Sequence, residues 1–229
     1  MCFSASASFG ISAVLFVGGV FAVKKTRVLQ QVPFSSIPLV FSFQQFTEGI
    51  LWLSLTNPIY AGWQQASTYL FLIIAHVFWP LWVSISLLLL EKNLIRRKIL
   101  LLSAVLGVVV SVFLAYSLFN YSVSSVESGH HISYSISFPH YIVGSFGVFY
   151  FISTVIPFFI STVKKMNLLG CVLLISFIIT KLFFEEYLPS VWCFFAAPSS
   201  IIVLIIMAGF QTSYEKLNKI AINNNTFIA

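Results

Sequence analysis

Three ionisable side chains lie within long apolar runs, where a charge is costly. They are Glu48, His76 and Lys181. Because a charged side chain at the centre of a bilayer costs at least about 2.5–3.5 kcal/mol, residues of this kind usually serve a function. A carboxylate near a histidine in a low-dielectric cavity can perform acid–base chemistry. We therefore predict that Glu48 is a general base or metal ligand and that His76 is a second acid, base or ligand. Lys181 would stabilise an anionic group.

Sequence spacing groups further polar side chains with these three. Gln44, Glu48 and Trp52 recur at intervals of four residues, which places them on one face of a helix. Lys181 and Glu185 have the same spacing and can form an ion pair, which fits a purely structural role equally well. Substrate-binding residues are predicted in the same region: Gln44, Gln45, Trp52, His130, His131, Tyr134, His140, Glu185, Glu186 and Trp192. The alternatives are a hydrogen-bonded packing role for His76 and a solvated loop for His130 and His131.

The cysteines offer a second kind of chemistry. Cys2 and Cys193 both belong to the predicted outer face, where an oxidising compartment would allow a disulfide between them. Alternatively, their thiolates could bind a transition metal such as zinc together with His76, Glu48 or His140. The chain contains no HxxxH or HExxH motif, so such a metal site would have to be assembled from different helices. The sequence does not identify a cofactor.

The elements that position these residues must suit a membrane. The chain has 229 residues, of which 59% are apolar and 8% are charged, and its mean hydropathy is +0.99. A soluble domain carries roughly 25% charged residues. A water-facing surface cannot be built from 12 basic and 6 acidic residues, so a soluble globular fold is excluded. Nucleic-acid binding is not expected, because the basic residues are divided among short segments.

Seven apolar runs are long enough to cross a hydrocarbon core of about 30 Å as helices. They cover residues 8–23, 34–55, 66–90, 99–119, 141–163, 167–184 and 189–210. Their uninterrupted apolar stretches lack the alternation of a barrel strand, which favours helices. The prediction is an all-α, polytopic membrane protein with a seven-helix domain over residues 1–210 and a polar cytoplasmic tail over residues 211–229.

The basic residues predict the orientation of these spans. Eleven of the twelve follow the first, third, fifth or seventh span: Lys24, Lys25, Arg27, Lys92, Arg96, Arg97, Lys98, Lys164, Lys165, Lys216 and Lys219. The connections 56–65 and 120–140 contain no lysine or arginine. The positive-inside rule therefore puts the N-terminus outside and the C-terminus in the cytoplasm. We expect a multi-pass protein of the cell (inner) membrane whose partners are membrane lipids.

Five ordered motifs carry a family resemblance. They are MCFSASASF at the N-terminus, QQFTEGILW (44–52), HVFWPLW (76–82), GHHISY (129–134) and SVWCFFAA (190–197). With them the chain resembles a family of uncharacterised bacterial seven-helix membrane proteins that begins with the same MCFSA motif. The resemblance implies a polytopic membrane protein and brings no established activity.

Three functions fit these observations. The first is a membrane-embedded enzyme that acts on a lipid or lipid-linked substrate through a polar pocket open to the extracytoplasmic side. The second is a proton-coupled carrier in which Glu48 titrates, and the third is a sensor or assembly protein without turnover. The enzyme is preferred because the polar residues gather on one side of the predicted membrane, whereas a carrier needs a polar path through both halves.

Overall fold

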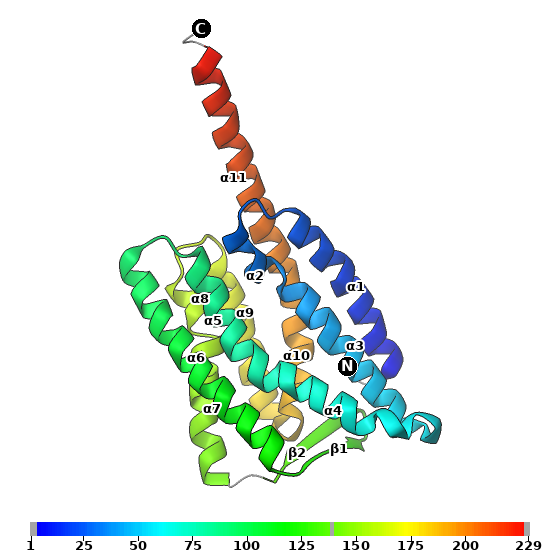
Figure 1. Ribbon diagram of the computed structural model, residues 1–229. Coiled ribbons are helices and arrows are strands. Elements are labelled where there is room, and N and C mark those ends of the chain that lie inside the picture. Colours follow the sequence, from blue (N-terminus) through cyan, green and yellow to red (C-terminus); the bar gives the residue numbers. More distant parts are fainter. Residues whose placement is uncertain (1–3, 138–139, 227–229) are drawn as a thin grey trace.

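Helices account for most of the computed structural model, which describes residues 4–137 and 140–226 (Figure 1). The longer helices are α1 (Ala5–Lys24), α3 (Ile37–Thr56), α4 (Gln64–Leu72), α5 (Trp79–Leu90), α6 (Leu94–Asn120), α7 (His140–Thr154), α9 (Met166–Phe183), α10 (Leu188–Ala196) and α11 (Ser200–Thr226). Shorter turns are η1 (Leu29–Gln31), α2 (Val32–Ser35), η2 (Pro58–Trp63), η3 (Ile73–Phe78), α8 (Pro157–Ile160), η4 (Glu185–Tyr187) and η5 (Ala197–Ser199). The all-helical prediction is thus confirmed in its main part.

Five helical segments of the described chain are long and apolar enough to cross a membrane. They are Ala5–Lys24, Pro58–Leu90, Leu94–Asn120, Met166–Phe183 and Glu185–Thr212. The predicted spans 34–55 and 141–163 are not among them. The first coincides with α3, whose two glutamines and glutamate lower its hydropathy. Within the second, the apolar helix among the described residues is the shorter Gly147–Ile160. The number of seven spans therefore stays a prediction.

Proline explains the interruption of the predicted span 66–90. Pro80 has no backbone N–H and cannot donate to the preceding turn, and the residues just before it form the π-helical turn η3. Two carbonyls of this turn are satisfied from neighbouring helices. Tyr150 donates to the carbonyl of Ala75 at 2.6 Å, and Ser111 donates to that of Val77 at 2.6 Å. Side chains from α6 and α7 therefore fix the irregular turn. Lipid could not do so, because it offers no hydrogen-bond donors to the backbone carbonyls.

Two helix pairs approach closely through small residues. Ser12 of α1 and Ser42 of α3 each donate to the other's backbone carbonyl at 2.8 Å. A Cβ atom on Gly107 of α6 would lie 2.3 Å from the carbonyl oxygen of Pro80, so only glycine permits this contact with α5. Small residues serve the same purpose between membrane helices generally.

A β-hairpin occupies the segment that we predicted as a loop. Strands β1 (Val123–Ser128) and β2 (His131–Ile136) pair antiparallel, with Ser128 opposite His131. Gly129, the first of the two turn residues, has a φ of 61°, which suits a type II′ turn. The expectation of a loop is wrong here. In β2, Ile132, Tyr134 and Ile136 alternate with Ser133 and Ser135, a pattern of period two that favours a strand, whereas β1 shows no such alternation. The hairpin covers the end of the bundle opposite to the end from which α11 projects (Figure 1).

Polar contacts join the connections at the other end of the bundle. Lys25 donates to Gln211 at 3.3 Å, and Arg27 lies 3.7 Å from the carboxylate of Glu215. Arg96 donates to the carbonyl of Ile160 at 2.8 Å. Because α11 continues to Thr226, the predicted polar tail 211–229 begins as part of this helix.

The Glu91 carboxylate joins two of these connections. It accepts hydrogen bonds from the backbone N–H of Asn93 at 2.9 Å, and from the N–H and hydroxyl of Thr162 at 2.7 and 2.8 Å. Burial of the side chain opposes its ionisation, but these hydrogen bonds outweigh burial and hold the pKa of Glu91 below its ordinary value. The ionised form is therefore the one that holds α5 to the segment before α9.

Replacing Glu91 with glutamine should remove this contact and its pH dependence. Because the pKa is lower in the folded protein than in the unfolded chain, the carboxylate stabilises the fold fully above a pH of about 4.3. That stabilisation is lost as the pH falls through the folded-state pKa. We expect Glu91→Gln to lower the free energy of unfolding by about 1.5–3 kcal/mol at neutral pH. As the pH falls, the free energy of unfolding of this variant should decrease less steeply than that of the wild type.

The midpoint of thermal unfolding in detergent, followed by circular dichroism over a series of pH values, measures both effects. Glu127→Gln is the matched control, because Glu127 is exposed on β1 and should leave both unchanged. A decline in acid that is equally steep in Glu91→Gln and the wild type would contradict the assignment.

Candidate functional site

The Glu48 carboxylate lies at the centre of the candidate site. Glu48 is fully buried on α3, one turn after Gln45, whose amide donates to Glu48 Oε2 at 3.1 Å. The hydroxyl of Ser190, from the first turn of α10, donates to Glu48 Oε1. Ser190 and Gln45 are also fully buried. A buried carboxylate is tolerated only when hydrogen bonds compensate for the lost hydration, and these two supply part of that compensation.

A second polar contact joins the same two helices one turn away. The amide of Gln44 donates to Cys193 Sγ at 3.1 Å, and the indole of Trp79 donates to Gln44 Oε1 at 2.8 Å. All three side chains are buried. Gln44 and Glu48 lie four residues apart on α3, and Ser190 and Cys193 lie three apart on α10. The two contacts therefore form successive rungs between antiparallel faces of these helices.

Several buried polar atoms around these rungs have no hydrogen-bond partner in the part of the chain that the structure describes. They include Gln45 Oε1, Trp52 Nε1, His76 Nδ1 and Trp192 Nε1. Buried polar groups are almost always hydrogen-bonded, so each exception requires a reason such as a bound ligand or water. Three of these atoms belong to α3 and α10, the helices that meet at Glu48, and water or a polar ligand beside the carboxylate would give them partners.

The β-hairpin covers this region. Ile132 is fully buried and clusters with Leu51 and Trp52, while Tyr134 stacks on Phe71 with ring centroids 4.8 Å apart. Thr68 and Ser125 hydroxyls share a hydrogen bond of 2.7 Å, which fixes β1 to α4. Trp52 is one turn beyond Glu48, so the hairpin closes the end of the α3 face that carries the carboxylate.

The aromatic side of the hairpin also contacts the turn before α10. The His131 ring stacks on Tyr187, with centroids 4.7 Å apart, and Ser128 shares a hydrogen bond of 3.0 Å with the Tyr187 hydroxyl. Burial lowers the pKa of His131, which favours the neutral ring at pH 7. These contacts hold the hairpin over the residues that lead to Ser190.

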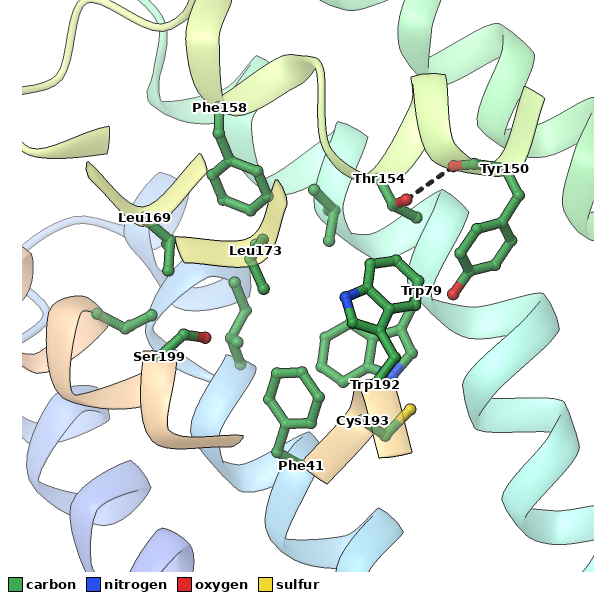
Figure 2. Close-up of a pocket in the computed structure, with 13 residues that line it drawn as sticks. Phe41, Trp79, Tyr150, Thr154, Phe158, Leu169, Leu173, Trp192, Cys193 and Ser199 are labelled. Atoms are coloured by element: carbon green, nitrogen blue, oxygen red, sulfur yellow. Dashed lines mark hydrogen bonds between the residues drawn. The ribbon is translucent and has the colours of Figure 1, made fainter. Parts of the chain in front are cut away.

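An apolar cavity of about 50 Å³ lies beside the second rung. Its walls come from α3, α5, α7, α8, α9, α10 and α11, and in the view of Figure 2 Leu169 and Leu173 lie to the left and Trp79 and Trp192 to the right. Cys193 and Ser199 contribute to its lining, and Thr154 donates to the Tyr150 carbonyl at 2.7 Å at its edge. The lining is mainly aliphatic and aromatic, which suits a hydrocarbon group.

The structure brings only part of the predicted site together. Gln44, Glu48 and Trp52, which were predicted to share a helix face, are all buried, and so is Gln45. His76 lies in η3, where its ring centroid is 6.5 Å from that of Tyr150. Tyr150 also contacts Trp192 of α10. Trp192 and Cys193 are buried on α10 and line the cavity. The other predicted residues lie on the hairpin, on the surface or outside the described side chains.

Lys181 is not brought to the buried carboxylate. It lies exposed near the end of α9, where it pairs with Glu185 four residues later. Glu185, Glu186 and His130 are exposed as well. The spacing of Lys181 and Glu185 predicted their pairing. It could not give the rotation of α9, which turns Lys181 outward, or the start of η4 that carries Glu185.

No three histidine, cysteine, aspartate or glutamate side chains in the described part of the chain gather in a position to hold a metal ion. Of the predicted ligands, Cys193 and Glu48 belong to different rungs and bind Gln44 and Ser190. Cys2 lies outside the described residues, and the side chain of His140 is not among those described. The metal and disulfide interpretations of Cys2 are therefore untested.

Sequence reasoning missed Ser190, which contacts the carboxylate directly. A serine among apolar residues carries no distinctive signal, and the chain contains many. Its position in the motif SVWCFFAA, next to the predicted residues Trp192 and Cys193, was the one available indication.

The comparisons with known proteins support the family resemblance. The model of DUF6629, described as a family of unknown function, matches residues 1–216. No curated protein and no solved structure matches the chain.

The contact between Trp79 and Gln44 can be tested with a double-mutant cycle. Gln44→Leu leaves the indole N–H of Trp79 buried without its acceptor, so we expect a loss of about 1–2 kcal/mol in the free energy of unfolding. Trp79→Phe removes the donor. If the bond forms, the double variant should be less destabilised than the sum of the two single variants. The readout is the unfolding midpoint in detergent by circular dichroism, and strictly additive effects would exclude the bond.

Proposed function

The chain belongs to DUF6629, a family of unknown function, and we propose that it is a membrane-embedded enzyme acting on a lipid or lipid-linked substrate. In this proposal seven helices span the cell (inner) membrane, with the N-terminus and the hairpin outside and α11 leading into the cytoplasm. Glu48 is the general base. One observation carries the proposal. The Glu48 carboxylate is buried and hydrogen-bonded, and polar atoms buried on the same helices have no hydrogen-bond partner among the described residues.

The distribution of charge supports the orientation. The connections at the end from which α11 projects carry Lys24, Lys25, Arg27, Lys92, Arg96, Arg97, Lys98, Lys164 and Lys165. The described hairpin carries no lysine or arginine. Basic residues concentrate on the cytoplasmic side of membrane proteins, which favours the hairpin as the outer end.

Packing supports α3 as an additional span in spite of its polar residues. Gln44, Gln45, Thr47 and Glu48 are all buried within the bundle, so they do not contact lipid. Polar residues inside membrane proteins usually face the interior in this way. A seventh span would be formed by α7 and α8 together, which run from His140 to Ile160 with a break before Pro157.

Cysteine accessibility tests the orientation. We expect a single cysteine at Ser124, exposed on β1, to react with a membrane-impermeant maleimide in intact cells. A single cysteine at Leu94, 75% exposed at the start of α6, should react only after the membrane is opened. Both are introduced into a chain whose native cysteines are replaced by alanine. The reverse pattern would refute the orientation.

The chemistry proposed for Glu48 follows from its surroundings. A carboxylate that accepts a hydrogen bond from a hydroxyl can remove the proton of that hydroxyl or of a water in its place. Gln45 holds the second carboxylate oxygen, which fixes the direction of the first. The adjoining apolar cavity offers room for a hydrocarbon part of the substrate, and the unmatched indole and amide groups offer hydrogen bonds to a polar part.

Lipid conversion by the purified protein tests this proposal. Wild type, Glu48→Gln and the exposed control Glu127→Gln are reconstituted into vesicles of a total bacterial lipid extract, and the lipids are analysed over time by mass spectrometry. We expect a lipid species to be converted by the wild type and the control. Conversion should be at least 100-fold slower in Glu48→Gln, because a general base contributes about 10²–10⁴-fold.

Unfolding midpoints of the three proteins show whether any loss reflects misfolding. Lipids that stay unchanged with the wild type, relative to protein-free vesicles, would overturn the enzyme proposal. Equal conversion by the wild type and Glu48→Gln would overturn the role of Glu48.

A further inference from the structure

We propose that Ser190 is the nucleophile of this site and that the substrate is an ester of a short acyl group, of about two to four carbons, carried by a lipid or lipid-linked molecule. This inference rests on the proposed function and names its reaction as acyl transfer to water. It follows from the arrangement of Ser190, Glu48 and Gln45, from the place of Ser190 relative to the apolar cavity, and from the size of that cavity.

The three side chains have the order of a nucleophile, a base and a residue that orients the base. The Ser190 hydroxyl donates to Glu48 Oε1, and the Gln45 amide donates to Glu48 Oε2 at 3.1 Å. An activated serine requires an adjacent general base that is itself held in place by a third group. All three residues are fully buried, so bulk water does not compete for the hydroxyl or the carboxylate.

The cavity begins one helical turn from the proposed nucleophile. Ser190 and Cys193 lie three residues apart on one face of α10, and Cys193 lines the cavity. One turn of an α-helix advances about 5.4 Å. Ser190 itself does not line the cavity, so an ester held there must extend past Cys193 toward the first turn of α10 to reach the Ser190 oxygen. Trp192, which also lines the cavity, has an unmatched indole N–H.

The size and lining of the cavity define the acyl group. A cavity of 150 Å³ lined by apolar side chains binds benzene, which corresponds to roughly 25 Å³ for each carbon. The cavity beside Cys193 measures about 50 Å³, which by that ratio holds about two carbons. An acyl group of three or four carbons would fit only if a lining side chain such as Leu173 or Phe41 moved. The apolar walls favour a hydrocarbon group over a charged or sugar group.

The start of α10 suits the charge that develops during attack. Ser190 lies in the first turn of this helix, which spans Leu188–Ala196 and has no side-chain cap. The N-terminal end of a helix carries a partial positive charge that stabilises nearby anions. An ester carbonyl attacked by Ser190 develops its negative oxygen close to this end, where a fixed dipole stabilises it.

The reaction proceeds in two balanced steps. Ser190 Oγ attacks the carbonyl carbon while Glu48 takes the hydroxyl proton, and the ester C–O bond breaks as the alcohol leaves with that proton. The acyl group is then bound to Ser190. Water adds to this acyl-enzyme with Glu48 again as the base, which releases the carboxylic acid and returns the proton to Ser190.

A covalent serine probe tests the nucleophile. Purified wild type in lipid nanodiscs is treated with an ethyl fluorophosphonate, which forms a phosphonyl ester with an activated serine and releases fluoride. Peptide mass spectrometry should find the adduct on Ser190. We expect no adduct at this position in Ser190→Ala and at least tenfold slower labelling of Ser190 in Glu48→Gln.

Ser86→Ala is the matched control, because Ser86 is equally buried but its hydroxyl donates to the carbonyl of its own helix at Trp82. In Ser86→Ala, Ser190 should be labelled at the same rate as in the wild type. Because the adduct is located in the wild type, the test does not depend on the folding of the Ser190 variant. An unmodified Ser190 in the wild type, or undiminished labelling of Ser190 in Glu48→Gln, would overturn the proposal.

Ester chain length tests the acyl group. We expect the wild type to hydrolyse p-nitrophenyl acetate or butyrate at least tenfold faster than p-nitrophenyl octanoate, and Val203→Ala, which enlarges the cavity wall, to reduce that preference. Equal rates for short and long esters would refute the short acyl group. Loss of lipid conversion in Glu48→Gln with an unlabelled Ser190 would refute this inference and leave the proposed function intact. A labelled Ser190 with no converted lipid would refute the lipid-carried substrate and the proposed function, and would leave only the assignment of Ser190 as an activated serine.

Discussion

The burial of the Glu48 carboxylate is the constraint on which the centre of this protein depends. A carboxylate removed from water loses hydration worth many kcal/mol and is tolerated only where hydrogen bonds replace that hydration. Ser190 and Gln45 provide two of these bonds. Because Ser190 belongs to α10, the need of the Glu48 carboxylate for a hydrogen bond also determines how the first turn of α10 packs against α3. The neighbouring rung from Gln44 to Cys193 extends the same register.

The irregular turn η3 is a second consequence of building within an apolar medium. Pro80 cannot donate a backbone hydrogen bond to the turn before it, and two carbonyls of that turn accept hydrogen bonds from Tyr150 and Ser111. Tyr150 therefore serves two purposes, since it fixes the turn that carries His76 and also lines the cavity. π-Helical turns often occur at functional sites, and here the turn places Trp79 so that its indole reaches Gln44.

Prediction from the sequence was accurate where a one-dimensional pattern carries the information. Four-residue spacing placed Gln44, Glu48 and Trp52 on one face, and all three are buried together. The same reasoning paired Lys181 with Glu185 but could not give their exposure, because the period of a helix does not say which way its faces turn. The hairpin was missed because its short alternating pattern is weak, and its stability comes from contacts such as Thr68 with Ser125 that join distant parts of the chain.

The sequence by itself determined that the chain is helical and apolar, where its basic residues concentrate, and which ionisable groups lie in apolar runs. These properties depend on composition and on local periodicity, which every segment carries regardless of its neighbours. Only the tertiary structure decided that Ser190 meets Glu48, that Lys181 turns outward and that a hairpin covers the α3 face. Those outcomes depend on how helices rotate and pack against one another to satisfy buried polar groups, and that choice involves all the helices at once.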